Sequence, residues 1–181
     1  INIDAFSECV ELERIIVNPN NPTYKDMDGV LYSKDSRMII NYPAKKKDKE
    51  YFLPEDVAFI CPEAFKDNHN LEVVKIGDNV TALSDYAFKN CTNLKTLALG
   101  SSVRIIGKEA FANCPNLKEI FSANIFPPHN CPIVYDSSIY EKCTVYVPTG
   151  SSFHYRRTLE WKDFKNMEER EHRLFKVMFG E

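Results

Sequence analysis

The dipeptide Ala-Phe recurs along this chain at a fixed interval. It begins at Ala64, Ala87 and Ala110, so successive copies are 23 residues apart (87 − 64 and 110 − 87), and it also begins at Ala5. The stretches between Ala64, Ala87 and Ala110 recur too. Each contains, in this order, a Cys or Asn, an Asn-Leu pair, further leucine-type positions and, before the next Ala-Phe, a V-x-x-I or V-x-x-L motif. Repetition at a period of this size indicates stacked supersecondary units, because one such unit cannot bury its own apolar side. The sequence therefore predicts a solenoid, an architecture that points away from an enzyme.

The leucines within one unit predict the course of the chain. Leu94, Leu97 and Leu99 follow an L-x-x-L-x-L pattern, which places a short strand on one side of each coil with these side chains inward. Strands of neighbouring coils should then pair in parallel, about 4.8 Å apart. The phenylalanines and the first leucines should form buried columns, and the asparagines should bond backbone groups at the bend before each strand. These residues are Phe65, Phe88 and Phe111, then Leu71, Leu94 and Leu117, and lastly Asn70, Asn93 and Asn116.

The first copy of the repeat is separated from the others by extra residues. It matches the pattern through Cys9, Leu12, Ile15 and Val17, but the distance from Ala5 to Ala64 is 59 residues, one period plus 36. Within about 18–52, two strand-prone runs flank a polar turn at 34–36, while 18–21 and 26–29 read as further turns. We interpret this insertion as a β-hairpin that projects from the edge of the solenoid.

These motifs resemble the BspA-like leucine-rich repeats of bacterial surface proteins. The resemblance rests on the four Ala-Phe units, the Asn-Leu pairs, the D-G-V-L-Y run at 28–32 and a terminal motif that includes 144–148 and W-K-D-F at 161–164. It implies a β-rich (α+β) solenoid, a right-handed superhelix with coils of about 23 residues. We assign the repeats to 1–126 and a C-terminal cap to 127–166, and leave the structure of the tail at 167–181 undecided between strand and helix.

Composition excludes several classes of protein. The net charge is 23 − 26 = −3, so no general attraction to nucleic acid is expected. No apolar run approaches the ~20 residues that cross a bilayer. The chain starts in mid-repeat at Ile1, without a leader, so we expect further repeats before it and draw no conclusion about export.

Signals of catalysis or metal binding are weak. The four histidines are scattered, and His129 with Cys131 and Cys143 fits no common zinc spacing. The run at 26–29 resembles a calcium loop, but Tyr24 would stand where the first carboxylate is required, so a tight turn is the better interpretation. We therefore expect no catalytic residue, metal or cofactor.

The six cysteines fall into groups. Cys9, Cys91 and Cys114 share one repeat position and should be buried thiols. Cys131 and Cys143 lie outside the repeat and form the candidate disulfide if the protein is exported. Cys61 has no evident partner.

A solenoid leaves its outward strand positions free to bind a partner. Here the candidate partner surface consists of Arg14, Ile16, Phe59, Lys75, Thr96, Ile105, Glu119 and Phe121. Its apolar members could form one contiguous patch, which would mark a partner site, or they could be covered by the hairpin, the cap or a neighbouring coil.

The family resemblance implies a secreted or cell-surface bacterial protein that acts by binding. The leading hypothesis is a non-enzymatic protein-interaction module, an adhesin for host extracellular-matrix proteins. Two alternatives stay open: a structural spacer that presents other domains, and a glycan-binding module accessory to an enzyme.

Overall fold

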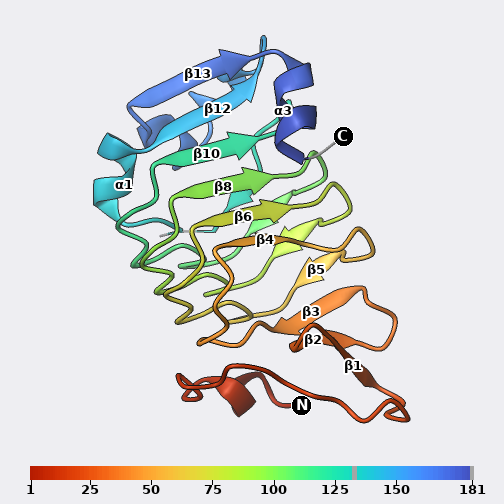
Figure 1. The fold of residues 1–181 in the computed structure, drawn as a ribbon. Coiled ribbons are helices and arrows are strands. Elements are labelled where there is room, and N and C mark those ends of the chain that lie inside the picture. Colours follow the sequence, from red (N-terminus) through yellow and green to blue (C-terminus); the bar gives the residue numbers. More distant parts are fainter. Residues whose placement is uncertain (132–133, 180–181) are drawn as a thin grey trace.

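In the computed structural model of the chain, each 23-residue unit forms one coil of a solenoid and gives one strand to each of two sheets (Figure 1). The structure describes residues 1–131 and 134–179. Its elements are η1 (Ile3–Phe6), β1 (Tyr24–Met27), β2 (Val30–Ser33), β3 (Met38–Asn41), β4 (Glu50–Phe52), β5 (Phe59–Ile60), β6 (Val73–Ile76), β7 (Ala82–Leu83), β8 (Thr96–Leu99), β9 (Ile105–Ile106), β10 (Glu119–Ser122), β11 (His129–Asn130), α1 (Ser137–Lys142), β12 (Thr144–Pro148), α2 (Ser152–Tyr155), η2 (Trp161–Asp163), β13 (Asn166–Arg170) and α3 (His172–Phe179).

The two sheets run along opposite sides of the stack. The seven-stranded sheet has the order β1-β2-β3-β5-β7-β9-β11, and the six-stranded sheet has the order β13-β12-β10-β8-β6-β4. Strands of successive coils pair in parallel in the repeat register, with Val74 opposite Leu97 and Leu97 opposite Ile120. The predicted solenoid and its strand register are thus confirmed, and the leucine-type strands form the six-stranded sheet.

The predicted phenylalanine column fills the core between the sheets. Phe65 and Phe88 stack with ring centroids 4.5 Å apart, and Phe88 and Phe111 with centroids 5.2 Å apart. All three rings are buried, as are the three leucines of the second predicted column. The stack continues beyond the phenylalanines to a tyrosine at each end, Tyr42 and Tyr135.

The asparagines and cysteines of the repeat bond one coil to the one before it. Asn93 Nδ2 donates to the carbonyl of His69 at 2.6 Å, and Asn70 and Asn116 make the corresponding bonds. The buried thiol of Cys91 donates to the carbonyl of Phe65 at 3.2 Å. Asn68, at the same repeat position, donates to backbone carbonyls of the preceding coil. Cys and Asn interchange there because each supplies a donor.

The first copy of the repeat does not form a strand, contrary to our expectation. Cys9 is exposed, and the segment lies apart from the stack in Figure 1. The reason lies in its backbone donors: Ile15 N–H bonds to the carbonyl of Gly29 at 2.9 Å, and Val17 N–H bonds to Asp26 Oδ1 at 2.8 Å. These donors are therefore not available to a neighbouring strand.

Most of the supposed insertion is a further coil. Tyr42 stands 23 residues before Phe65, and its N–H donates to the carbonyl of Ala64 at 2.7 Å, as Phe65 N–H donates to Ala87 at 2.8 Å. Strand β4 then takes the leucine-strand position of this coil, with Tyr51 opposite Val74. Of the 36 extra residues, 23 are thus a repeat, which leaves 36 − 23 = 13 as true insertion.

The predicted hairpin is confirmed, but it does not project. Strands β2 and β3 pair antiparallel around the turn at 34–36, and β3 pairs in parallel with β5, so the hairpin is part of the seven-stranded sheet, in which β1 is the edge strand. A second hairpin joins β1 to β2 through Asp28 and Gly29, both at positive φ. A Cβ on Gly29 would lie 2.9 Å from Arg14 Cβ, so glycine is also needed for space.

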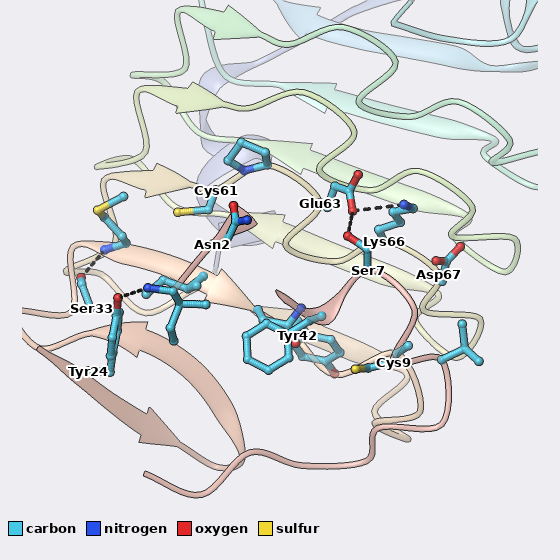
Figure 2. A pocket seen from close by; sticks show the side chains of 18 of the residues that line it. Asn2, Ser7, Cys9, Tyr24, Ser33, Tyr42, Cys61, Glu63, Lys66 and Asp67 are labelled. Atoms are coloured by element: carbon cyan, nitrogen blue, oxygen red, sulfur yellow. Dashed lines mark hydrogen bonds and ion pairs between the residues drawn. The ribbon is translucent and has the colours of Figure 1, made fainter. Parts of the chain in front are cut away.

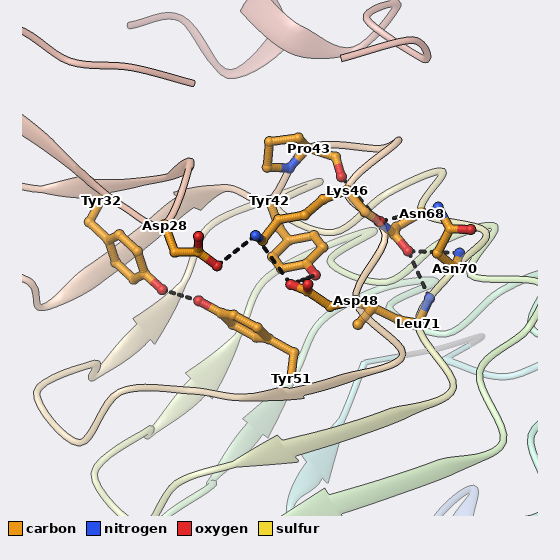
Figure 3. A network of polar contacts seen from close by, with 10 residues as sticks. All are labelled: Asp28, Tyr32, Tyr42, Pro43, Lys46, Asp48, Tyr51, Asn68, Asn70 and Leu71. Atoms are coloured by element: carbon orange, nitrogen blue, oxygen red, sulfur yellow. Dashed lines mark hydrogen bonds and ion pairs between the residues drawn. The ribbon is translucent and has the colours of Figure 1, made fainter. Parts of the chain in front are cut away.

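A polar network covers the Tyr42 end of the aromatic column (Figure 3). Tyr42 O–H donates to Asp48 Oδ2 at 2.8 Å. Lys46 Nζ lies 2.8 Å from Asp28 Oδ2 and 3.2 Å from Asp48 Oδ2. The hydrogen bond from Lys46 is the main reason why the pKa of Asp28 lies below its ordinary value.

The C-terminal segment closes the other end. Strands β12 and β13 extend the six-stranded sheet in parallel, with Ile120 opposite Val145 and Val145 opposite Met167. The buried Tyr155 hydroxyl donates to the carbonyl of Asn124 at 3.0 Å, and the buried Trp161 Nε1–H to the carbonyl of Pro128 at 2.8 Å. The tail left undecided from sequence thus contains most of β13 and helix α3.

Candidate functional site

The outer face of the six-stranded sheet carries two columns of side chains. The first contains Glu50, Val73, Thr96, Glu119, Thr144 and Asn166. The second contains Phe52, Lys75, Ala98, Phe121, Tyr146 and Glu168. The structure therefore brings together the predicted surface residues Lys75, Thr96, Glu119 and Phe121.

Aromatic rings and cations contact one another along the second column. Lys75 Nζ lies 4.3 Å from the centroid of the Phe52 ring. The rings of Phe121 and Tyr146 stack with centroids 4.5 Å apart, and the guanidinium of Arg170 lies 5.0 Å from the Tyr146 centroid. We call these five residues the aromatic-cation column. Each contact holds a long side chain in one arrangement on the open surface.

The polar groups beside this column are also ordered. Glu72 bridges Lys49 and Lys95. The hydrogen bond from Lys95 is the main cause, and that from Lys49 the second, that holds the pKa of Glu72 below its ordinary value. Thr96 Oγ1 donates to Glu119 Oε2 at 3.2 Å. Burial is the main cause that raises the pKa of Tyr146, so its phenol remains neutral at physiological pH.

Arg14 and Ile16 do not join these columns. Their expected places are taken by Glu50 and Phe52 of β4, because the first repeat copy forms no strand. Ile16 is 73% exposed on the N-terminal segment.

Phe59 and Ile105 lie on the opposite sheet. They form a row with Met38, Ala82 and His129 along the seven-stranded sheet. Phe59 is 43% exposed and Ile105 48% exposed, but neither can be contiguous with Phe121 across the core. The structure therefore does not gather the apolar residues of the candidate surface into one patch, because they divide between two faces.

Sequence reasoning missed three members of the aromatic-cation column: Phe52, Tyr146 and Arg170. A signal existed for Phe52, which stands 23 residues before Lys75 (75 − 52). Tyr146 follows Phe121 by 25 residues, and the contact of Arg170 depends on β13, whose polar sequence does not indicate a strand.

All six cysteines are free thiols in the structure. The expected Cys131–Cys143 bridge is not formed, because Cys131 follows β11 of the seven-stranded sheet whereas Cys143 leads into β12 of the six-stranded sheet. Burial raises the pKa of the Cys143 thiol to about 12 and that of the Cys114 thiol to about 12. Both are therefore protonated and unreactive at neutral pH.

No cation site is evident in the described part of the chain. Within it, no three His, Cys, Asp or Glu residues lie together in a way that could hold a metal ion. None of its helices has the length and apolar character needed to cross a membrane.

Comparison with known proteins identifies the family. Residues 44–145, more than half of the chain, match the BspA type leucine rich repeat region in six copies, so the chain belongs to this family. It is thus a leucine-rich repeat module of the kind found in bacterial surface proteins. No protein with a curated description matches the chain.

Solved structures of similar proteins come from bacteria. A leucine-rich repeat protein from Eubacterium ventriosum is 29% identical, with a TM-score of 0.69 over 78% of this chain and 37% of its own. A leucine rich cell surface protein from Faecalibacterium prausnitzii is 25% identical, with a TM-score of 0.69 over 96% of this chain and 46% of its own. The pneumococcal vaccine antigen PcpA, 20% identical with a TM-score of 0.56 over 88% of this chain and 50% of its own, shares the fold. The chain therefore spans half or less of each of these proteins.

Proposed function

We propose that this chain is a non-enzymatic protein-interaction module of a secreted or cell-surface bacterial protein, and that it binds its partner through the outer face of the six-stranded sheet. The observation that carries this proposal is the aromatic-cation column. Aromatic and arginine side chains dominate binding energy at protein interfaces. Phe52, 51% exposed, stands at the accessible end of the column.

The contacts within the column favour binding by lowering its entropic cost. Immobilising a flexible side chain on association costs roughly 0.5–1.5 kcal/mol. Lys75 is already held against Phe52, and Arg170 against Tyr146. These two side chains are therefore already ordered in the free protein, and binding a partner costs less side-chain entropy.

The same contacts favour a protein over a glycan as partner. A sugar ring binds an aromatic side chain by lying on an open ring face. Here Phe121 and Tyr146 each cover one face of the other, while Lys75 and Arg170 lie over Phe52 and Tyr146. Most of the ring faces in the column are thus occupied, and the charged ends of Lys75 and Arg170 suit the side chains of a protein.

An adhesin for host extracellular-matrix proteins is the specific role that we propose. It can be tested by surface plasmon resonance against immobilised matrix proteins and, in parallel, against a glycan array. We expect saturable binding to a matrix protein that the triple variant Phe52→Ala, Phe121→Ala, Tyr146→Ala reduces at least tenfold.

The matched control is the double variant Phe59→Ala, Ile105→Ala, which removes exposed apolar residues from the opposite sheet. Equal loss of affinity in both variants, with unchanged circular dichroism, would refute the assignment of the face. Binding to glycans alone would favour the accessory-module alternative, and no binding in either assay would favour the spacer.

A further inference from the structure

The two ends of the stack present their apolar surface differently. At the N-terminal end a cavity of about 430 Å³ lies between the N-terminal segment and the coil that begins at Tyr42 (Figure 2). Glu63 in its wall is already paired, since its Oε2 atom accepts hydrogen bonds from Ser7 Oγ at 2.8 Å and from Lys66 Nζ at 3.1 Å. At the C-terminal cap, large apolar side chains instead project from the surface.

The projecting side chains belong to two segments, the loop after β10 and the segment that contains α2. Their exposed fractions are 61% for Ile125, 66% for Phe126, 63% for Phe153 and 62% for Leu159. The buried Tyr155 hydroxyl of α2 donates to the carbonyl of Asn124 at 3.0 Å and lies 2.7 Å from Ser122 Oγ. These bonds fix the two segments beside each other.

Ring contacts join the exposed residues of both segments. The centroid of the His154 ring lies 4.6 Å from that of Phe126 and 5.8 Å from that of Phe153. The guanidinium of Arg157 lies 5.1 Å from the Phe153 centroid. We call Phe126, Phe153, His154 and Arg157 the cap patch. Its residues follow the ends of β10 and β12, so it lies beyond these strands and is separate from the aromatic-cation column on their outer face.

The cap patch is positively charged. The segments 122–130 and 151–159, which form it, contain Arg156 and Arg157 but no Asp or Glu. Among the described residues neither guanidinium forms an ion pair: that of Arg157 lies over the Phe153 ring, and that of Arg156 donates to the carbonyl of Met167 at 3.5 Å. The patch is therefore complementary to an apolar surface that carries negative charge.

Two neighbouring carboxylates bond to other donors. Glu160 Oε2 accepts a hydrogen bond from the Tyr140 hydroxyl at 3.3 Å. Glu169 accepts hydrogen bonds from the backbone N–H groups of Gly150 at 2.9 Å and Ser152 at 3.1 Å. The arginines thus stay available to a partner.

The shape of the patch favours a lipid bilayer over a folded protein as this partner. Binding energy between proteins is concentrated in side chains that fill fitted pockets. Apolar side chains that project from a surface enter the headgroup region of a bilayer without such a pocket, and cations beside them are attracted to anionic lipids. We propose that the cap patch binds the surface of an anionic phospholipid bilayer, with the Phe126 and Phe153 rings inserted and with Arg156 and Arg157 at the phosphates.

The test is co-sedimentation with vesicles of phosphatidylglycerol and phosphatidylcholine in equal amounts, beside vesicles of phosphatidylcholine alone. We expect binding to the anionic vesicles and about tenfold weaker binding to the neutral ones. The double variant Phe126→Ala, Phe153→Ala should lower the partition coefficient on anionic vesicles about tenfold or more, because two rings no longer enter the lipid. The matched control Phe59→Ala, Ile105→Ala removes two exposed apolar residues from the opposite sheet and should leave binding unchanged.

Arg157→Gln tests the charge of the patch without removing a ring. It should weaken binding to anionic vesicles about fivefold, the effect of one cation near an anionic surface, and leave binding to phosphatidylcholine unchanged. The side chains changed in these variants are exposed, so each variant should keep the circular dichroism spectrum of the wild type.

An absence of binding at millimolar phosphatidylglycerol, or equal binding to the two kinds of vesicle, would overturn the proposal. Equal losses in the Phe126→Ala, Phe153→Ala variant and in its control would overturn it as well. If that variant lost binding to an immobilised matrix protein while its vesicle binding stayed unchanged, the proposal would be wrong and the cap patch would belong to a protein interface.

Discussion

Replacing Phe88 with Ala tests the aromatic column directly. The ring is fully buried, and its two faces are covered by Phe65 at 4.5 Å and Phe111 at 5.2 Å. The neighbouring coils cannot move inward to fill the space, because Phe88 N–H is bonded to the carbonyl of Ala110 at 2.8 Å and Phe65 N–H to that of Ala87 at 2.8 Å. The cavity should therefore stay largely open.

Phe→Ala changes in cores cost about 3–5 kcal/mol, and poor collapse places this site near the upper end. This range already includes the lost stacking contacts, so we expect about 4–5 kcal/mol, a large fraction of the free energy of unfolding of a single domain. Equilibrium unfolding in urea, followed by far-UV circular dichroism, measures the change. The midpoint should fall while the slope with denaturant stays constant.

Phe59→Ala is the matched control, because Phe59 is 43% exposed on the outer face of the seven-stranded sheet. It should cost less than about 1 kcal/mol, the usual range for surface positions. A loss below 1 kcal/mol for Phe88→Ala, or an equal loss for both variants, would refute the conclusion that the column supports the fold.

Three further predictions concern stability. Gly100→Ala should destabilise the protein by more than about 1 kcal/mol in the same assay, because a Cβ would lie 2.5 Å from the carbonyl oxygen of Gly77; an unchanged midpoint would contradict this packing. Tyr135→Phe should raise stability by about 1 kcal/mol, because the buried hydroxyl lacks a partner among the described residues; a loss would show that the hydroxyl is satisfied. The pKa of Asp28 is lower in the folded than in the unfolded chain, so its carboxylate stabilises the fold. This stabilisation is fully present above about pH 4 and is lost as the pH falls through the folded-state pKa. Lys46→Met should therefore flatten the acid side of the stability profile, and an unaltered profile would exclude this pair as its source.

The core was predictable because its positions repeat. Phe65, Phe88 and Phe111 occupy equivalent points of successive coils, so spacing alone places them in one column. The same logic gave the correct register for Thr96 and Glu119 on the outer face. The coil at Tyr42 escaped notice because Asn-Tyr replaces Ala-Phe there, although the 23-residue interval was present.

The two ends could not be predicted in the same way. At the N-terminal end, Ile15 and Val17 match the leucine pattern, yet their backbone donors bond to the hairpin region instead of a strand. A side-chain pattern does not reveal which backbone groups compete for a donor. At the other end, the charged sequence of β13 has no apolar alternation, and only pairing with β12 makes it a strand.

The charged sequence of β13 has a consequence for the assembly of whole molecules. Parallel pairing can in principle continue from one protein to the next, since a terminal strand presents unpaired backbone groups. Strand β13 carries Glu168, Glu169 and Arg170, charges that natural proteins place where edge-to-edge growth must be prevented. Glu169 is itself held by the backbone N–H groups of Gly150 and Ser152. The β13 edge of the six-stranded sheet therefore disfavours pairing with a second molecule. This keeps a protein made of self-complementary units from growing into a fibre.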